Sequence, residues 1–372
     1  MLKAQVEYFK NLDGLRFLCF LAVFTVHSLH TDNPAVQSNF FFKFIVGDLL
    51  ANGGLGVNFF FVLSGFLITY LLILEKQTTG RINILHFWFK RVIRIWPLYF
   101  ACVLFGFVIF PLIKQYLGQS VEESADLNLY LLFLGNFDIL KNGWPDATEL
   151  GVLWSISIEE QFYLVWPVLL YFIPIKRYWV VFSSVLLISL IFRAFNDIPL
   201  VFHYHTLSCI SDMAVGGFGA WLVLTPVFRN FIVRLSKVQI ILIYVVFFTL
   251  FVFKEQLLDQ IFVLRILERL IISVLIVLII LEQNYSSNSF YKMGNFKRIS
   301  KLGLTTFGNY MLHVIGILIV VTLFKLFKIT DNIYTLLIIV PILSLILTIY
   351  LGKISYNILE KPFLRLRKYL NN

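Results

Sequence analysis

Charged residues are scarce in this chain of 372 residues. Asp, Glu, Lys and Arg make up 14% of it, whereas 59% is hydrophobic and the mean hydropathy is +0.84; an ordinary soluble domain carries about 25% charged residues. So little charge cannot cover a water-facing surface, which excludes soluble enzymes and disordered chains. Repeated apolar runs close to the roughly 20 residues that a helix needs to cross a bilayer predict an all-α, polytopic membrane protein.

Cysteine is also scarce. Cys19, Cys102 and Cys209 all lie in or beside apolar runs, so a disulfide scaffold is excluded. His203 and His205 stand two residues apart, but no cysteine or carboxylate cluster accompanies them in the sequence. We therefore expect no metal site.

Ten membrane spans are expected from hydropathy, at residues 17–31, 53–74, 95–113, 154–173, 178–193, 205–224, 238–254, 263–282, 304–324 and 334–353. An even number places both termini on one side of the membrane. Most Lys and Arg fall in segments on that side, and because cytoplasmic segments are enriched in basic residues, both termini are expected in the cytoplasm. The net charge of +10 is then a topology signal of a protein embedded in the lipid bilayer, and nucleic-acid binding is not expected.

Two segments between the spans are long. Residues 75–94 are expected to form a basic cytoplasmic loop, and residues 114–153 the largest outer loop. Within the outer loop, residues 127–137 are apolar but too short to cross, so they are expected to form a re-entrant or surface helix. The whole chain, residues 1–372, is expected to be one membrane-embedded domain with no soluble domain before or after it.

The first span carries two ionisable residues. Arg16 and His27 are eleven positions apart in the sequence, so the two lie about 20° apart around a helix and about 16 Å apart along it. An ionisable group at membrane depth is a candidate functional residue, and an imidazole can take up and return a proton near neutral pH. Equally, Arg16 could extend to lipid phosphates while His27 bonds a neighbouring helix.

Two further motifs follow. Ser64 and Gly65 in the second span are small enough for another helix, or a ligand, to approach the backbone, and helix packing is the commoner reason. Arg91 and Arg94 are one helical turn apart, and two guanidinium groups on one face suit binding of phosphate oxygens. A basic anchor beside an aromatic belt explains this arginine pair equally well.

Residues 153–163 open the fourth span from the outer side, and they are polar for that location. Ser155 with Glu159, or Ser157 with Glu160, stand near the spacing of a capping box. These side chains are therefore expected to cap the helix or to bind a hydroxylated acceptor, with capping slightly favoured.

Two residues near the end of the chain are weaker candidates. His313 lies near the inner end of the ninth span, where a single histidine is more often a packing residue. Pro362 discourages helix at the residue before it, which keeps Glu360 close to the cytoplasmic end of the tenth span. A solvated carboxylate is the simplest interpretation of Glu360, unless it meets the arginines of the segment 75–94.

In this order, the motifs resemble the acyltransferase-3 family of bacterial membrane O-acyltransferases. The family's pattern is Arg-x10-His, Phe-Phe-x-x-Ser-Gly, Arg-x-x-Arg, Trp-Ser-x-Ser-x-Glu-Glu-Gln-Phe-Tyr and a terminal Glu-x-Pro. The matching residues are Arg16 and His27; Phe60, Phe61, Ser64 and Gly65; Arg91 and Arg94; 154–163; and Glu360 and Pro362. Each motif is weak alone, but five in register over the chain are specific. Residues 307–310, before His313, depart from the family's more usual Ser-Tyr-x-x-Tyr-Leu-Leu-His.

The resemblance implies a ten-helix domain in the bacterial cytoplasmic (inner) membrane. It implies transfer of an acyl group, most often acetyl, from cytoplasmic acyl-CoA to a hydroxyl of a cell-surface glycan or lipid-linked sugar. His27 and Arg16 would be catalytic, with His27 either a general base or an acyl carrier. The donor acyl-CoA would be bound by Arg91, Arg94, Phe60, Phe61, Ser64 and Gly65. Acceptor-binding or structural roles would fall to Trp154, Ser157, Glu159, Glu160, His313, Glu360 and Pro362.

Two other functions account for part of the sequence. A proton-coupled transporter or flippase of a sugar-linked lipid would use Arg16 and His27 as a proton relay. A scaffolding membrane protein explains the hydropathy but leaves this pair without a role. The identity of the acceptor and the oligomeric state are not indicated by the sequence.

Overall fold

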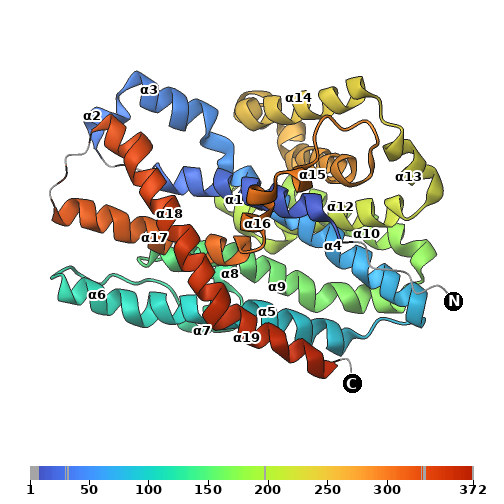
Figure 1. Ribbon diagram of the computed structural model, residues 1–372, viewed down its shortest axis with the longest axis horizontal. Coiled ribbons are helices and arrows are strands. Elements are labelled where there is room, and N and C mark those ends of the chain that lie inside the picture. Colours follow the sequence, from blue (N-terminus) through green and yellow to red (C-terminus); the bar gives the residue numbers. More distant parts are fainter. Residues whose placement is uncertain are drawn as a thin grey trace.

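The computed structural model describes residues 8–29, 31, 33–196, 198–327, 329 and 332–370. Within these residues there are helices and no strand, so the all-α prediction is confirmed. Many of the long helices run roughly along the long axis of the molecule (Figure 1). The stretches long and apolar enough to cross a membrane in this part of the chain number seven: Phe40–Thr79, Ile84–Tyr116, Ile175–Phe195, Pro199–Val223, Lys237–Asp259, Thr306–Leu326 and Thr335–Arg367.

The other three expected spans are also long helices. They are α1 (Lys10–Ser28), α9 (Thr148–Phe172) and α15 (Phe262–Tyr285). Each carries charged residues along its length, including Arg16, Glu159 and Arg269, and these lower its mean hydropathy. The three polar helices supply several of the candidate site residues, and the number of membrane crossings stays a prediction.

The remaining elements follow the expected spans closely. The longer helices are α4 (Leu55–Thr79), α5 (Ile84–Leu104), α10 (Tyr178–Phe195), α12 (Thr206–Val223), α14 (Lys237–Lys254), α17 (Thr306–Leu326) and α18 (Val340–Ser355). The shorter ones are α2 (Pro34–Gln37), α3 (Phe40–Phe42), α6 (Phe110–Tyr116), α7 (Leu127–Leu131), α8 (Gly135–Asn142), α11 (Pro199–Tyr204), α13 (Pro226–Val233), α16 (Lys297–Gly303) and α19 (Lys361–Leu364). π-Helical or 3₁₀ turns are η1 (Lys43–Leu49), η2 (Ala51–Gly54), η3 (Phe105–Ile109), η4 (Ile175–Arg177), η5 (Glu255–Asp259), η6 (Met293–Asn295), η7 (Thr335–Ile339), η8 (Tyr356–Glu360) and η9 (Arg365–Leu370).

Two expectations about local structure are wrong. Residues 75–94 are not a loop, because α4 continues to Thr79 and α5 begins at Ile84. The Asn83 side chain caps α5 by accepting from the His86 N–H. Pro362 does not break the last helix either, because the π-helical turn η8 carries α18 directly into α19. Within the segment 114–153, the expectation of a short helix at residues 127–137 is confirmed: α7 and α8 lie there, and neither is long enough to cross. Its re-entrant or surface position stays a prediction.

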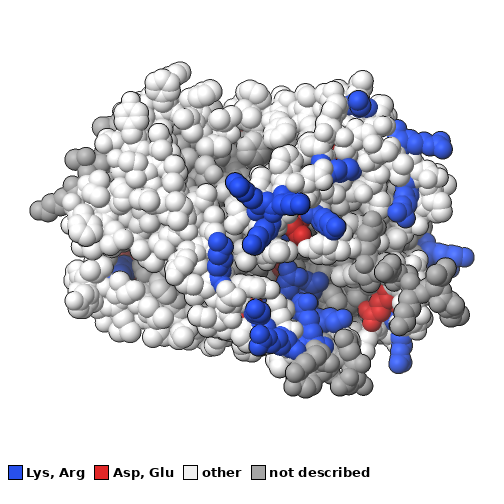
Figure 2. Space-filling view, viewed as in Figure 1, with Lys and Arg blue, Asp and Glu red and all other residues white. Residues whose placement is uncertain are grey.

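The two ends of the described chain lie at the same end of the bundle. In Figure 1 the start of α1 and the end of α19 are both on the right. On the face shown in Figure 2, most Lys and Arg gather over that half, and the opposite half is almost free of them. This distribution is what cytoplasmic termini require, although the side that faces the cytoplasm stays a prediction.

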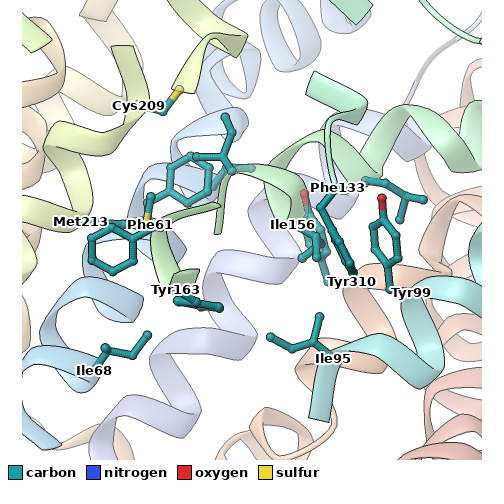
Figure 3. Close-up of a cluster of buried hydrophobic side chains, with 14 of the residues drawn as sticks. Phe61, Ile68, Ile95, Tyr99, Phe133, Ile156, Tyr163, Cys209, Met213 and Tyr310 are labelled. Atoms are coloured by element: carbon teal, nitrogen blue, oxygen red, sulfur yellow. The ribbon is translucent and has the colours of Figure 1, made fainter. Parts of the chain in front are cut away.

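The helices pack around an apolar core that includes many aromatic rings. Figure 3 shows Phe61 and Met213 from α4 and α12 on one side, with Tyr99 and Tyr310 on the other. α4 and α12 touch backbone to backbone: a Cβ added at Gly65 would lie 2.0 Å from the Met213 carbonyl oxygen. The glycine of the Phe-Phe-x-x-Ser-Gly motif therefore brings two helices together.

Candidate functional site

A cavity of about 1140 Å³ lies among the long helices. Its lining includes His27 at the end of α1, Asn58 near the start of α4, Thr148 at the start of α9 and Phe324 near the end of α17. All of these helix ends are remote from the start of α1. We call this space the outer cavity, because it lies in the half of the bundle opposite the chain termini.

His27 faces the outer cavity and pairs with a second histidine. Its Nδ1 lies 2.7 Å from Nε2 of His313, and the planes of the two rings are inclined to each other by 20°. His27 is accessible through the cavity, whereas His313 is completely buried. The placement of His313 near the inner end of its span is therefore wrong, because it lies at the same depth as His27.

The hydrogen bonds of this pair determine its tautomers. Nδ1 of His313 lies 2.5 Å from the carbonyl oxygen of Tyr310, which can only accept, so that nitrogen carries a proton. In a neutral His313 ring, Nε2 is then an acceptor, and Nδ1 of His27 must donate to it. The remaining nitrogen, Nε2 of His27, carries a lone pair when the ring is neutral.

Aromatic and hydroxyl groups surround the histidines. The Tyr310 hydroxyl lies 2.7 Å from Oγ of Ser155, and the ring of Phe60 packs edge-on against Tyr310 at 5.8 Å. Trp154 also lines the cavity and packs edge-on against Phe61. The structure thus brings Phe60 and Phe61 of one motif into ring contact with Tyr310 and with Trp154 of another, two residues that line the same cavity as His27. Tyr310 itself was not predicted, and its position three residues before His313 was the only signal.

Three arginines lie together towards the other half of the bundle, and we call them the arginine cluster. Arg16 pairs with Asp13 at 2.8 Å and is within electrostatic range of Arg94. Arg91 lies over the ring of Tyr163, 5.0 Å from its centre. Since α1 is one unbroken helix, Arg16 remains on the same face as His27 and about 16 Å from it along the axis.

Glu159 connects the arginine cluster to α4. Ser64 donates to one of its oxygens at 3.1 Å, and the Tyr163 hydroxyl donates to the other. Arg91 and Arg94 both interact with this carboxylate electrostatically. Ser64, Glu159 and the two arginines, which belong to three separate motifs, therefore meet in space.

The capping interpretation of residues 155–160 is wrong. α9 begins at Thr148, so these residues lie in the middle of the helix and not at a span mouth. Ser157 bonds back to the Leu153 carbonyl at 3.1 Å, and Glu160 accepts from the Trp96 indole at 3.0 Å. The spacing of Ser and Glu did not distinguish the two cases. The same spacing occurs in the interior of a helix when the polar side chains contact other helices.

Glu360 is not a solvated carboxylate. It is 5% exposed, at the end of η8, and lies within electrostatic range of Arg94. The structure therefore supports the alternative in which Glu360 meets the arginines. Pro362, two residues further on, lies in the first turn of the last short helix. Gly65 faces α12, and a contact of Gly65 with a donor stays a prediction.

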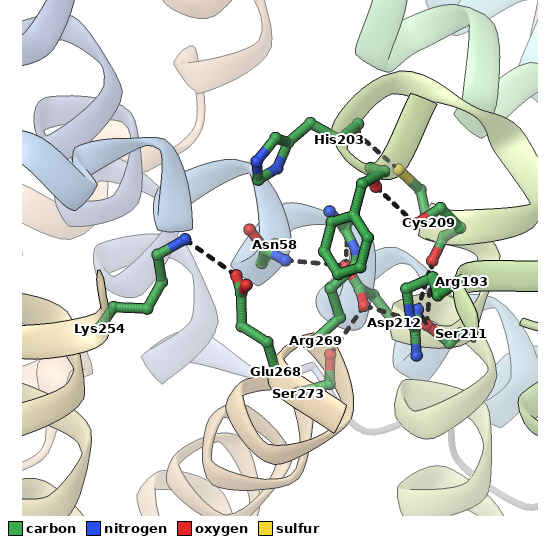
Figure 4. A network of polar contacts seen from close by, with 12 residues as sticks. Asn58, Arg193, His203, Cys209, Ser211, Asp212, Lys254, Glu268, Arg269 and Ser273 are labelled. Carbon is green, nitrogen blue, oxygen red and sulfur yellow. Dashed lines mark hydrogen bonds and ion pairs between the residues drawn. The ribbon is translucent and has the colours of Figure 1, made fainter. Parts of the chain in front are cut away.

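A second polar cluster, which the sequence analysis missed, lies beside the outer cavity (Figure 4). Asp212 is completely buried and accepts from Arg269 at 2.6 Å, from Asn58 at 3.0 Å and from Ser273 at 3.0 Å. The buried Arg193 donates to Ser211 and to two backbone carbonyls. Charged residues within the predicted spans 205–224 and 263–282 were the available signal, since a charge at membrane depth needs a partner.

Metal ligands do not gather anywhere in the described residues: no group of three or more His, Cys, Asp or Glu could hold an ion there. Polar residues gather instead at the outer cavity and around the arginines. A helical membrane protein with an accessible histidine, a buried histidine paired to it and buried arginines has the features of an integral-membrane enzyme.

Comparison with known proteins identifies the family. A family model described as "Acyltransferase domain" matches residues 9–352, so the chain belongs to this acyltransferase family, and the resemblance inferred from the motifs is confirmed. It is 30% identical over 174 residues to "O-acetyltransferase OatA" of Staphylococcus aureus, which covers 45% of this chain and 25% of that protein. It is 32% identical over 169 residues to "Putative peptidoglycan O-acetyltransferase YrhL" of Bacillus subtilis, covering 44% and 24%.

These matches span about a quarter of the length of the two curated relatives. No solved structure matches the chain.

Proposed function

We propose that this chain transfers an acetyl group from acyl-CoA, bound at the cytoplasmic end, to a hydroxyl of a cell-surface glycan or lipid-linked sugar in the outer cavity. The observation that carries the proposal is the His27 ring: it is open to a large cavity, and its partner His313 leaves Nε2 as the free basic atom. Family membership and the similarity to two O-acetyltransferases support acetyl as the group, and the similarity to the putative peptidoglycan O-acetyltransferase supports a glycan as the acceptor.

As a general base, His27 moves one proton from the acceptor hydroxyl to the leaving sulfur. Nε2 accepts the proton of the acceptor hydroxyl, the hydroxyl oxygen attacks the thioester carbonyl, and the carbon–sulfur bond breaks. The leaving CoA sulfur then takes the proton from His27. A general base of this kind contributes typically 10²–10⁴-fold to a rate. In the alternative, Nε2 attacks the thioester carbonyl first, the carbon–sulfur bond breaks and CoA leaves as the thiolate. The acceptor hydroxyl then attacks the acetyl group, the bond to Nε2 breaks, and the hydroxyl proton is left to neutralise the thiolate.

The arginine cluster is suited to the anionic end of acyl-CoA. Arg94 is exposed, and no carboxylate oxygen lies within 4 Å of it in the part of the chain that the structure describes. Arg91 is held over Tyr163 by its ring contact, without a paired carboxylate at that distance. Two such guanidinium groups bind phosphate oxygens in the paired geometry that arginine favours.

Replacing Arg94 with Ala should weaken donor binding. A hydrogen bond to a charged group contributes about 1.5–3 kcal/mol, so KM for acetyl-CoA should rise about 10–100-fold, with kcat changed far less. Steady-state kinetics at varied acetyl-CoA tests this. Arg81→Ala is the matched control, because Arg81 lies in the exposed connection between α4 and α5 and carries the same charge. An Arg94→Ala enzyme with the wild-type donor KM would contradict the assignment.

Replacing His313 with Ala should act on kcat and not on either KM. His313 positions His27 by accepting its Nδ1–H, and losing that bond should lower kcat about 10–100-fold. Gln at position 313 can still present an oxygen to His27, so His313→Gln should recover part of the loss. A KM effect alone, or equal losses in the Ala and Gln variants, would remove the positioning role.

The reaction itself is tested by supplying labelled acetyl-CoA to membranes that contain the protein. Label in a hydroxylated glycan product, absent from membranes without the protein, is the expected result. Movement of a sugar-linked lipid without acyl-CoA and without labelled product would favour the transporter or flippase.

A further inference from the structure

The outer cavity has a second group of lining residues, from the segments around α11, α14 and α15, that the reaction scheme does not use. Three of its aromatic rings stand in a row: Tyr204 packs edge-on against Trp154 at 4.7 Å and against Trp144 at 5.2 Å. Trp144 is 54% exposed. The row therefore extends from an open part of the cavity towards Trp154, which stands beside Phe61.

Polar side chains line the same space. Figure 4 shows the polar ends of Asn58, His203 and Lys254 directed towards a common region. Lys254 is fixed by Glu268 at 3.0 Å and by Asp259 at 3.7 Å. Asn58 donates to Asp212 at 3.0 Å, and Lys254 is held by its two carboxylates, so these two hydrogen-bonding groups are already in place.

Arg269 supplies an unused donor in this wall. Its Nη2 pairs with Asp212 at 2.6 Å, but its buried Nε has no hydrogen-bond partner in the described structure. The side chain is 6% exposed and lines the cavity. A buried donor without a partner is unfavourable, and an oxygen atom of a bound ligand would satisfy it.

The charges of the wall do not favour an anion. Besides His203, the described residues Lys254, Arg269, Glu255 and Glu268 line the cavity there. Arg193, Asp212 and Asp259 stand directly behind them, which makes three cations and four anions. Lys254 and Arg269 are already paired with carboxylates. Among the described residues that line this wall, an anionic ligand would therefore meet no unpaired buried cation and would lie next to carboxylates.

We infer that this wall is the acceptor subsite, and that it takes an uncharged, polyhydroxylated sugar unit. The apolar face of the sugar ring packs on Tyr204 and Trp144, and its hydroxyls bond to Asn58, Lys254, Glu268 and Arg269. Aromatic rings next to fixed charged donors and acceptors suit a ligand with one apolar face and many hydroxyls. The assignment rests on the proposed function, because it places the acceptor in the cavity that His27 faces.

The test uses the purified full chain, labelled acetyl-CoA and two probes: the uncharged trimer of N-acetylglucosamine and the anionic trimer of galacturonic acid. The uncharged trimer should be labelled, and the anionic one should not. Tyr204→Leu and Trp144→Leu should each raise KM for the uncharged trimer about three- to tenfold. Neither should change KM for acetyl-CoA. Trp179→Leu is the control, because Trp179 is an exposed tryptophan of α10 outside the cavity lining.

The outcomes separate this inference from the proposed function. If membrane glycan is labelled but the uncharged trimer is not, or if the anionic trimer is preferred, the subsite assignment fails and the proposed function stands. The subsite assignment also fails if both variants keep the wild-type KM for the uncharged trimer. Two variants are used because one of them could fail to fold. If nothing is labelled in membranes or with purified protein, the proposed function fails and the subsite assignment with it.

Discussion

Replacing His27 with Ala is expected to lower the rate of acetyl transfer by about 10²–10⁴-fold. The reason is that Nε2 of His27 is the free base of the histidine pair and His27 lines the outer cavity, while an alanine side chain can neither take the hydroxyl proton nor carry the acetyl group. The variant should fold, because the ring borders a cavity and its removal leaves no buried charge. Initial rates with labelled acetyl-CoA, together with the yield and melting temperature of the purified variant, measure both effects.

His86→Ala provides the matched control for this experiment. His86 lies at the start of α5, outside the lining of the outer cavity, and its loss should leave the rate within about twofold, as for surface changes generally. A His27→Ala enzyme with more than a tenth of wild-type activity would rule out both roles assigned to the ring.

Replacing Asp212 with Asn is expected to have the largest effect on stability. Asp212 is completely buried and pairs with Arg269, and Arg193 is buried close by. Removing one partner of a buried ion pair leaves an uncompensated charge and costs about 3–5 kcal/mol. Reversible unfolding in mixed micelles measures the free energy of unfolding. Asp146→Asn, which breaks the partly exposed pair with Lys114, should cost at most about 1 kcal/mol.

A double variant separates charge imbalance from lost packing. Adding Arg269→Met to Asp212→Asn removes the stranded cation, so the double variant should be more stable than Asp212→Asn alone. Two results would contradict a stabilising role of the Asp212–Arg269 pair. One is an Asp212→Asn variant that loses no more unfolding free energy than Asp146→Asn, and the other is a double variant less stable than Asp212→Asn alone.

The helical framework could be predicted because hydropathy and charge placement are local properties of the sequence. The expected spans correspond to long helices, and the arginines of α5 were correctly placed on one helical face. The ends of helices were less predictable. α5 starts eleven residues before its predicted span, because Asn83 caps the helix there and its first turns are basic. A hydropathy window detects only the apolar part of a helix, so it missed these turns.

The candidate site was predicted in pieces but not as an arrangement. His27 and the arginines could be singled out because ionisable groups in apolar runs are unusual. The contact between His27 and His313 could not, since the two lie 286 residues apart and no periodicity relates one helix to another. Asp212 and Arg269 lie within predicted spans and could have been noticed by the same rule that selected His27. Their pairing with each other needed the structure.

The most direct test of the central claim is acetyl transfer across sealed vesicles. The claim requires acyl-CoA from the cytoplasmic end, where the arginine cluster lies, and an acceptor on the opposite side, where His27 opens to the cavity. Labelled acetyl-CoA added outside inverted vesicles should produce labelled glycan ester inside them, and right-side-out vesicles given the same label outside should produce none. Equal labelling in both orientations, or labelling that persists in His27→Ala vesicles, would contradict the account.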